Sequence, residues 1–435
     1  MLDSVSPRER QAIEELSARH DEPKFLLEQR LKAWRLYEDM LAPSGTEEEW
    51  RRMDLEALNL DGVRLFPGAV THVPAPSTRR NGYGGEILQR DGITLSRRLS
   101  ADATRHGVIF SDLHSAAGDY PDLFRAHFMT EVVQPIAWKF VALHAALWRG
   151  GVFVHVPAGV EVDIPLHAAV SLAEGGAAVF PHTLIIAEEG SSVTLVEEHT
   201  SREGTRAGLS SGVVEILVRD GAQVRYVSVQ DWGASVNSFS TMRAVLGANS
   251  HLELGLIGSG SRMAKSNVEA ILSAPGATAQ IVGLFLAGGA QQMHISTLQD
   301  HRAPNTTSDL LFKSALKDSA QLVWNGLTRI RKGAAESDAN QSSRNLLLGE
   351  NAHVAPIPVL EIEAHDVARC SHGATVSSVD EEQLYYMMSR GLTRQDATRA
   401  IVEGFFRQGL ERLTPLQDYE AIGRTLERRL LAKAA

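Results

Sequence analysis

The chain has 435 residues and a formal net charge of −10, and 43% of its residues are hydrophobic. Its acidic balance argues against nucleic acid as a partner, and its single cysteine excludes an intrachain disulfide and fits a reducing compartment. The amino terminus carries no signal-peptide-like apolar run, and no apolar run reaches the length of a membrane span. We therefore expect a cytoplasmic protein that does not contact membranes.

Residues 1–149 are expected to form an N-terminal helical and mixed region. Ser6–Pro7–Arg8–Glu9 is a capping box with proline at the first helical position, which predicts the start of a helix. A second helical pattern extends from Phe25 to Leu41. Residues 119–148 carry apolar side chains at helical intervals, and Pro135 should kink or divide that helix.

From Gly150 to residue 375 the pattern changes to short β-runs, of which Val152–Pro157 is the first. Corners made of small residues recur between these runs, beginning at positions 190, 221, 249, 276, 289, 319, 333 and 351. Most intervals lie near one or two units of about 14 residues, which favours a β-solenoid whose turns bury their inward faces against one another. A β-sandwich would also give short strands, but it does not explain the corner spacing.

The only cysteine, Cys370, lies where the β-pattern ends and a helical C-terminal region, residues 376–435, begins. If this stretch is extended, Cys370 and His372 project from the same face of a strand. A thiolate beside an imidazole suits iron–sulfur iron, zinc or copper. Two ligands are too few for a closed site, however. The pair is therefore either structural packing or part of a site that another chain completes.

The sequence of the C-terminal region predicts three capped helices. Asp380 can cap a helix over Glu381–Ser389, and Gly391 can end it. Thr393–Asp396 resembles a capping box for the second helix, and Thr414 opens a third helix with an apolar stripe. Because such an appendage has little core of its own, we expect it to dock a partner.

Several segments carry a family resemblance, and they are Glu22–Pro23, Gly151–Pro157, His301–Ser308, Lys313–Leu316, Asn325–Gly326, Asn340–Leu348, Cys370–Thr375, Asp380–Tyr386 and Ser389–Gly391. Together they resemble the SufB/SufD family of iron–sulfur cluster assembly proteins. Ser371–Thr375 looks like SufD, because SufB-type chains carry Glu-His-Glu-Ala-Thr there and tend to have more cysteines. Ala364–His365–Asp366 departs from the paired acids usual in SufD, which leaves the role of Asp366 open.

The resemblance implies a right-handed parallel β-helix over residues 150–375, flanked by helical regions. It also implies a complex with a SufB-like scaffold and a SufC-like ATPase, the latter docking on C-terminal helices that include Tyr385, Arg390 and Phe405. In that family the histidine matched by His372 is implicated at the SufB–SufD contact. His372, with Cys370 beside it, would then handle a transient iron–sulfur cluster or iron shared with the partner, neither held stably by this chain alone.

We therefore expect a non-catalytic SufD-like subunit that can form a homodimer when isolated, with ATP hydrolysis in the partner. No P-loop, nucleophile elbow, zinc-protease motif or CxxC pair occurs in the chain. One alternative is a SufB-type scaffold that holds the nascent cluster itself, against which the single cysteine counts. Another is a solenoid carbohydrate-active enzyme, a class that is commonly secreted, against which the missing signal peptide counts.

Overall fold

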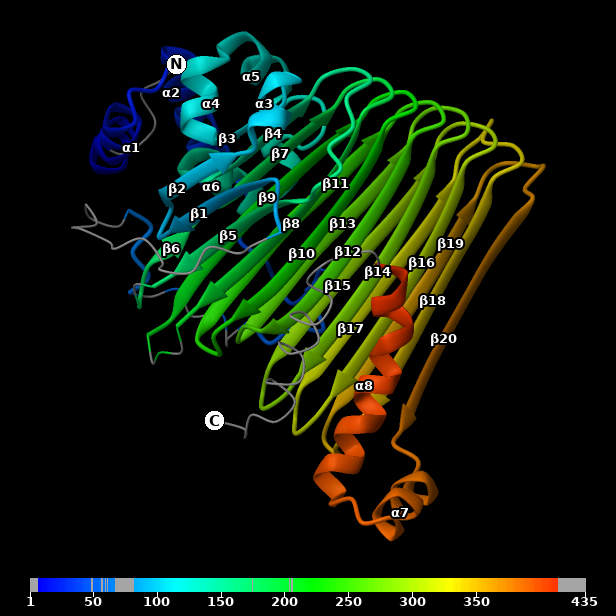
Figure 1. The fold of residues 1–435 in the computed structure, drawn as a ribbon. Coiled ribbons are helices and arrows are strands. Elements are labelled where there is room, and N and C mark those ends of the chain that lie inside the picture. Colours follow the sequence, from blue (N-terminus) through cyan, green and yellow to red (C-terminus); the bar gives the residue numbers. More distant parts are fainter. Residues whose placement is uncertain are drawn as a thin grey trace.

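The computed structural model describes residues 7–47, 50–55, 58, 60, 62–66, 82–173, 175–202, 204 and 206–413. Two long sheets of mainly parallel strands face each other and form a solenoid, with helices gathered at its first coils and two more after its last strand (Figure 1). This confirms the predicted solenoid core with helical ends. No helix in this part of the chain combines the length and hydrophobicity that crossing a bilayer requires.

The N-terminal helices are α1 (Pro7–Arg19), α2 (Lys24–Asp39), α3 (Ala101–Arg105), α4 (Leu113–Asp119), α5 (Pro121–His127), the short 3₁₀ helix η2 (Pro135–Ala137) and α6 (Lys139–Leu147). Pro135 divides the segment predicted to be helical over residues 119–148, but the division is larger than a kink. Pro121 and Pro135 each begin a new helix, as expected of a residue with no N–H to donate and a preset φ. The residues between α5 and η2 are not helical.

The first sheet contains, in spatial order, β2 (Ile93–Leu99), β1 (Gly85–Arg90), β5 (Leu166–Leu172), β8 (Ser192–Ser201), β10 (Gln223–Trp232), β12 (His251–Gly260), β14 (Thr278–Ala287), β16 (Thr307–Leu316), β18 (Asp338–Leu347) and β20 (Arg369–Ser378). The second sheet contains β19 (His353–Ile362), β17 (Gln321–Ile330), β15 (Gln292–His301), β13 (Met263–Leu272), β11 (Val236–Leu246), β9 (Gly208–Val218), β7 (His182–Ala187), β4 (Gly151–Val156) and β3 (Ile109–Asp112), with β6 (Ala178–Val179) beside β9. Except for the hairpin β1–β2 and the pair β3–β4, neighbouring strands are parallel. The antiparallel sandwich is therefore excluded.

From β4 onward each coil contributes one strand to each sheet. Equivalent residues of successive coils lie 26 to 32 positions apart, from Asn237 beside Met263 to Gln321 beside His353. One coil thus corresponds to two of the predicted units of about 14 residues, because each strand with its corner makes one unit.

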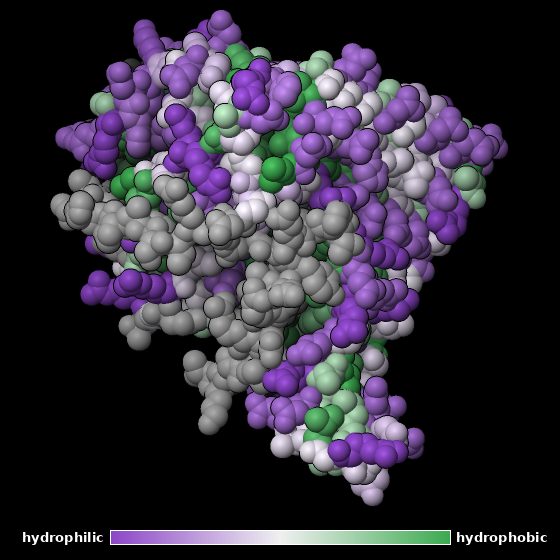
Figure 2. All heavy atoms as spheres, viewed as in Figure 1, coloured by the Kyte–Doolittle hydropathy of each residue, from purple (hydrophilic) through white to green (hydrophobic). Residues whose placement is uncertain are grey.

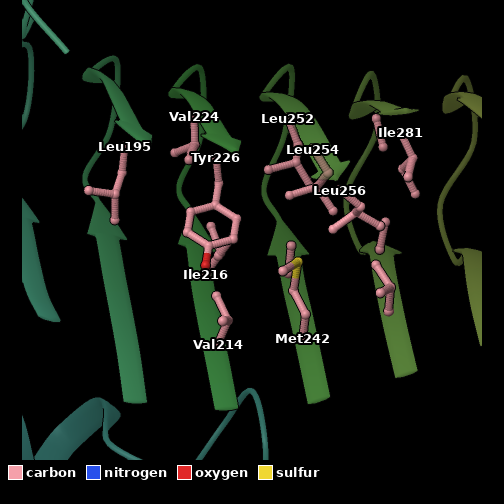
Figure 3. Packing of buried hydrophobic residues seen from close by; sticks show 14 of the residues in the cluster. Leu195, Val214, Ile216, Val224, Tyr226, Met242, Leu252, Leu254, Leu256 and Ile281 are labelled. Atoms are coloured by element: carbon pink, nitrogen blue, oxygen red, sulfur yellow. The ribbon is translucent and has the colours of Figure 1, made fainter. Parts of the chain in front are cut away.

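The solenoid is filled by alternate side chains of both sheets, as Figure 3 shows for Leu195, Tyr226, Val214 and Met242 among others. Burying a large apolar side chain of this kind stabilises the fold by about 1.5–3 kcal/mol relative to leaving it exposed. Tyr226 is fully buried, and its hydroxyl donates a 2.6 Å hydrogen bond to Glu197. The period-2 alternation of the strands therefore produces the inner core directly.

The two ends of the solenoid differ. Over the first coils, α6 and the segment before it pack on the outer face of the second sheet, with Trp148 against Phe128 and Phe140 stacked on Phe239. At the other end, β19 pairs only with β17 and β20 only with β18 among the strands of the described residues. The last coil therefore leaves its edge and much of its inward face open.

Two helices follow β20, namely α7 (Glu381–Ser389) and α8 (Arg394–Arg412). The predicted caps are confirmed: Asp380 accepts from the backbone N–H of Glu382 at 2.9 Å, and Thr393 accepts from that of Asp396 at 3.1 Å. Gly391 lies between them with φ +97°. The third predicted helix, from Thr414, lies outside the described residues.

Helix α8 is not an appendage without a core. It lies along the outer face of the first sheet over β14 and β16 (Figure 1). Phe406 and Leu410 pack there against Leu284 in one buried cluster. A Cβ added to Gly409 would lie 2.5 Å from Leu284 Cδ2, so glycine at this position permits the close approach of helix and sheet.

Candidate functional site

Cys370 and His372 lie on β20, the last strand of the solenoid. Parallel pairing with β18 places Cys370 beside Ala339 and His372 beside Gln341, both of which are fully buried. The two residues therefore share the inward face of the strand, as predicted from their spacing. His372 is nevertheless exposed and Cys370 is half-buried, because no strand of the described residues pairs with β20 beyond β18.

The structure shows one of the two roles that the sequence left open for Cys370, namely packing. It packs against a small apolar cluster of Ile330, Ala334 and Ala339 at the end of the solenoid. Partial burial raises the pKa of its thiol, which favours the protonated form in the isolated chain. The thiol of Cys370 therefore packs against the end of the core, whereas the imidazole of His372 is exposed.

These residues do not form a complete metal centre. Across the described ranges, no three His, Cys, Asp or Glu side chains are grouped so that they could hold a metal ion. A thiol and an imidazole at positions i and i+2 supply two donors of the kind that iron accepts. The donor chemistry fits an iron or iron–sulfur group, but further ligands would have to come from outside this set.

Apolar side chains are exposed on the two strands of the last coil. Val359 is 40% exposed, Ile362 is 47% exposed and Val376 is 42% exposed. Terminal repeats of a solenoid normally present polar residues, and an unpaired strand edge is usually protected from other chains. An apolar last coil with two free strand edges is therefore typical of a surface that another chain covers.

A polar groove of about 320 Å³ lies beside His372, between α8 and the outer face of β16, β18 and β20. Its carboxylate, Asp309, binds Arg412 at 2.6 Å and accepts from Asn340 at 2.7 Å. Arg344 lines the groove, and among the described residues its Nη1 makes a long 3.5 Å contact with Gln408. The open end thus carries positive charge on its outer side.

The three residues expected to dock a partner on the C-terminal helices differ in their surroundings. Tyr385 on α7 is 75% exposed, and Arg390 is exposed with its guanidinium 5.2 Å from the ring centroid of Tyr386. Phe405 on α8 is instead half-buried. Lys313 lies over its ring at 4.6 Å and donates a 2.6 Å hydrogen bond to its carbonyl oxygen. Phe405 therefore helps to attach α8 to the solenoid, and its part in docking a partner stays a prediction.

Lys313 is a buried cation beneath α8. Burial, together with the nearby charges of Arg344 and Arg412, lowers its pKa from 10.5 to about 8. The segment Lys313–Leu316, one of those that carried the family resemblance, thus serves the attachment of α8.

Another resembling segment, His301–Ser308, is structural. His301 is fully buried, with Nδ1 2.8 Å from Thr306 Oγ1 and Nε2 2.8 Å from Ser308 Oγ, so both ring nitrogens are bonded within one corner. Asp366, whose role was open, is exposed, and its carbonyl accepts from the backbone N–H of Glu336 at 2.7 Å. Neither segment adds a ligand at the open end.

Sequence reasoning missed the apolar rim formed by Val359, Ile362 and Val376. Each follows the ordinary inward or outward alternation of a strand, so nothing local distinguishes it from a core residue. The available signal was position: these side chains belong to the last strands before the helical region, and no further repeat follows to cover them.

Comparison with known proteins supports the family resemblance. Residues 170–405 match the family model described as "SUF system FeS cluster assembly, SufBD core domain". A SufBD family protein of Staphylococcus haemolyticus is 31% identical over 90% of this chain and 87% of its own length. The iron–sulfur cluster assembly protein SufB of Bacillus subtilis is 31% identical over 91% of this chain and 87% of its own length. A SufBD family protein of Staphylococcus aureus shows the same identity over 90% of this chain.

Proposed function

Because the chain belongs to the SufBD family of iron–sulfur cluster assembly proteins, we propose that it is a SufD-like, non-catalytic subunit of a cytoplasmic SUF complex. In this proposal the open end of the solenoid pairs with a SufB-like scaffold, and a SufC-like ATPase docks on the C-terminal helices. The observation that carries the proposal is the exposure of His372 on an inward strand face that is buried in the preceding coil.

The free edges of β19 and β20 support pairing with another chain. Each edge offers a row of backbone N–H and C=O groups, and strand addition at such an edge is a common mode of protein recognition. The exposed side chains of Val359, Ile362 and Val376 would be buried by the same contact. A second copy of this chain offers the same edges, which is consistent with a homodimer in the absence of the scaffold.

Within the joined interface, His372 and Cys370 would contribute an imidazole and a thiolate to a nascent cluster or to iron, which are cargo rather than resident cofactors. Partial burial disfavours the free thiolate of Cys370, whereas coordination to a metal deprotonates a thiol outright. Binding of iron by Cys370 would therefore release the thiol proton to solvent. The remaining ligands would come from the scaffold.

Helix α7 is the surface that we assign to the ATPase. Tyr385, Tyr386, Met388 and Leu392 are all at least 41% exposed, so an apolar and aromatic patch surrounds this helix. Figure 2 shows hydrophobic residues gathered at this tip of the molecule. Aromatic side chains on a small protruding helix are typical anchors of protein interfaces. Because α8 is packed on β14 and β16, motion imposed at α7 would reach the solenoid through a rigid connection.

A SufB-type scaffold is the second candidate, favoured by the similarity to SufB of Bacillus subtilis. The two assignments differ in whether the chain alone holds a cluster. Anaerobic reconstitution of the purified protein with iron and sulfide distinguishes them, because a SufD-like subunit would retain no cluster after desalting. A stable chromophore that disappears in Cys370→Ser would favour the scaffold. The family assignment leaves the carbohydrate-active enzyme without support.

The interface is tested by substitution on β20. Val376→Glu places a charge on the exposed inward face of the strand, and we expect it to abolish copurification with a coexpressed SufB-like chain while the melting temperature stays unchanged. Thr375→Glu is the matched control, because Thr375 is the adjacent exposed residue on the opposite face of the strand. Undiminished scaffold binding by Val376→Glu would contradict the proposed interface.

A further inference from the structure

Beneath the N-terminal helices, three titratable side chains form a hydrogen-bonded chain with no exposure to solvent. They are His144 on α6, His182 on β7 and Glu215 on β9, each 0% exposed. His144 Nδ1 lies 2.7 Å from the carbonyl oxygen of Ser211, and its Nε2 lies 3.0 Å from His182 Nδ1. His182 Nε2 in turn lies 3.1 Å from Glu215 Oε2.

Glu215 also holds the segment that precedes η2. Its Oε2 accepts from the backbone N–H of Met129 at 2.8 Å, and its Oε1 accepts from that of Val133 at 2.9 Å. Met129 has φ +52°, which a residue other than glycine rarely adopts. The carboxyl group therefore joins three parts of the fold: α6, the first coils and the segment 129–133.

The donors and acceptors of this hydrogen-bonded series can be assigned by starting from the contact between His144 and the carbonyl oxygen of Ser211. A carbonyl oxygen only accepts, so His144 Nδ1 carries the proton and donates to Ser211. A neutral His144 then accepts at Nε2, and His182 must donate from Nδ1. One proton is left for the contact between His182 Nε2 and Glu215 Oε2. It belongs either to a neutral carboxylic acid or to an imidazolium facing a carboxylate.

Burial favours the neutral form, because an ion pair without solvent pays a large desolvation cost. Burial raises the pKa of Glu215 to about 8, and the two backbone N–H donors only partly oppose it. Burial likewise lowers the pKa of His182 to about 3 and that of His144 well below its usual range.

The charged and titratable groups that face the chain from its surroundings do not reverse this balance. Glu131 contributes to the raised pKa of Glu215, and His127 at the end of α5 opposes it by a smaller amount. Arg30 on α2 adds to the lowering for His144. The ring of Phe128 covers His182 with a centroid separation of 4.5 Å, which keeps the contact dry.

We propose that Glu215 is a neutral carboxylic acid in the folded protein, and that its proton fastens the N-terminal helices to the first coils as a pH-sensitive lock. A protonated carboxyl meets every demand of the site, since the same oxygen donates to His182 and accepts from Met129. An amide cannot do both, because its NH₂ group only donates. Loss of the proton places an unpaired charge in a dry site, and local opening of segment 129–133 is the way to hydrate it.

The direction of the pH dependence follows from the shifts. Glu215 ionises near pH 4.5 in the open state and near pH 8 in the closed state, so opening becomes about tenfold more favourable per pH unit until pH 8 and then levels off. His144 and His182 protonate below pH 6.5 only in the open state, so opening also grows on acidification. The lock is therefore tightest near pH 6.5.

Two measurements on the full chain test this proposal. Infrared spectra at pH 7 should contain the carbonyl band of a protonated acid, which shifts on ¹³C-labelling of glutamate and is absent in Glu215→Gln. Hydrogen exchange of residues 129–133, corrected for intrinsic rates, should show opening that rises about fourfold between pH 6.5 and 8, because deprotonation of the two histidines in the open state offsets part of the tenfold-per-unit effect of Glu215. In Glu215→Gln the opening should be larger and lose this rise.

Glu131→Gln is the matched control. Glu131 is a nearby carboxylate that does not belong to the hydrogen-bonded series His144–His182–Glu215, and it accepts a 3.2 Å hydrogen bond from Arg219. This variant should keep both the acid band and the rise in opening. If Glu215→Gln fails to fold, the labelled wild-type protein still supplies both readouts. A wild-type spectrum without a protonated glutamate band at pH 7, or exchange that stays flat between pH 6.5 and 8, overturns the proposal.

Discussion

The attachment of α8 to the solenoid can be tested at Phe406. This side chain is 1% exposed and belongs to the cluster that α8 forms with the outer face of the first sheet. Truncating a fully buried phenylalanine costs about 3–5 kcal/mol, the sum of lost burial and the cavity left behind. Phe406→Ala should therefore increase opening of α8 by roughly two to three and a half orders of magnitude, at 1.4 kcal/mol per factor of ten.

Hydrogen exchange of residues 394–413, compared with that of β12, provides the assay. We expect faster exchange in the helix with little change in the strand, since β12 pairs on both edges within the solenoid. Arg407→Ala is the matched control, because Arg407 is exposed and its loss should change stability by no more than about 0.5 kcal/mol. Unchanged exchange of α8 in Phe406→Ala would refute the packing described above.

Two further predictions concern the surface of α7 and acid stability. Tyr385→Ser should leave the melting temperature unchanged, because Tyr385 is 75% exposed, but should weaken capture of a SufC-like ATPase, whereas a destabilised chain with normal capture would argue against a docking role. Glu22 is bound by Arg30 in a buried pair that lowers its pKa from 4.5 to about 2. This lowered pKa contributes about 3 kcal/mol above pH 4.5, which is lost as the pH falls to 2. Acid denaturation of Glu22→Gln should lack this component, and an identical acid transition in the variant would contradict the assignment.

The sequence predicted those features that depend only on neighbouring residues, such as helix caps, strand corners and the alternation of strand faces. Asp380 and Thr393 cap α7 and α8 because a short polar side chain satisfies the N–H groups of a helix start without tertiary help. The corners identified the solenoid because each coil repeats the same backbone reversal. The position of Cys370 and His372 on one strand face followed from the period of two.

Features that depend on contacts between distant segments escaped prediction. Phe405 and Phe406 are adjacent phenylalanines on α8, and the packing of the helix on Leu284 and Lys313 decides which of the two is fully buried. Glu215 and His182 lie 33 positions apart and meet only because β7 and β9 pair in register. His372 is exposed because β20 is the last strand of its sheet among the described residues, and the sequence around His372 does not reveal this.

The most direct test of the proposed function is the activity of iron–sulfur enzymes in cells that depend on His372→Ala as their only copy of this chain. Because His372 is exposed, its loss should change stability by no more than about 0.5 kcal/mol and leave complex formation intact. His365→Ala, which removes an exposed histidine in the turn before β20, provides the control. We predict lost or strongly reduced iron–sulfur enzyme activity for His372→Ala at matched protein levels, and normal activity for His365→Ala. Full activity of a stable His372→Ala protein would contradict the account.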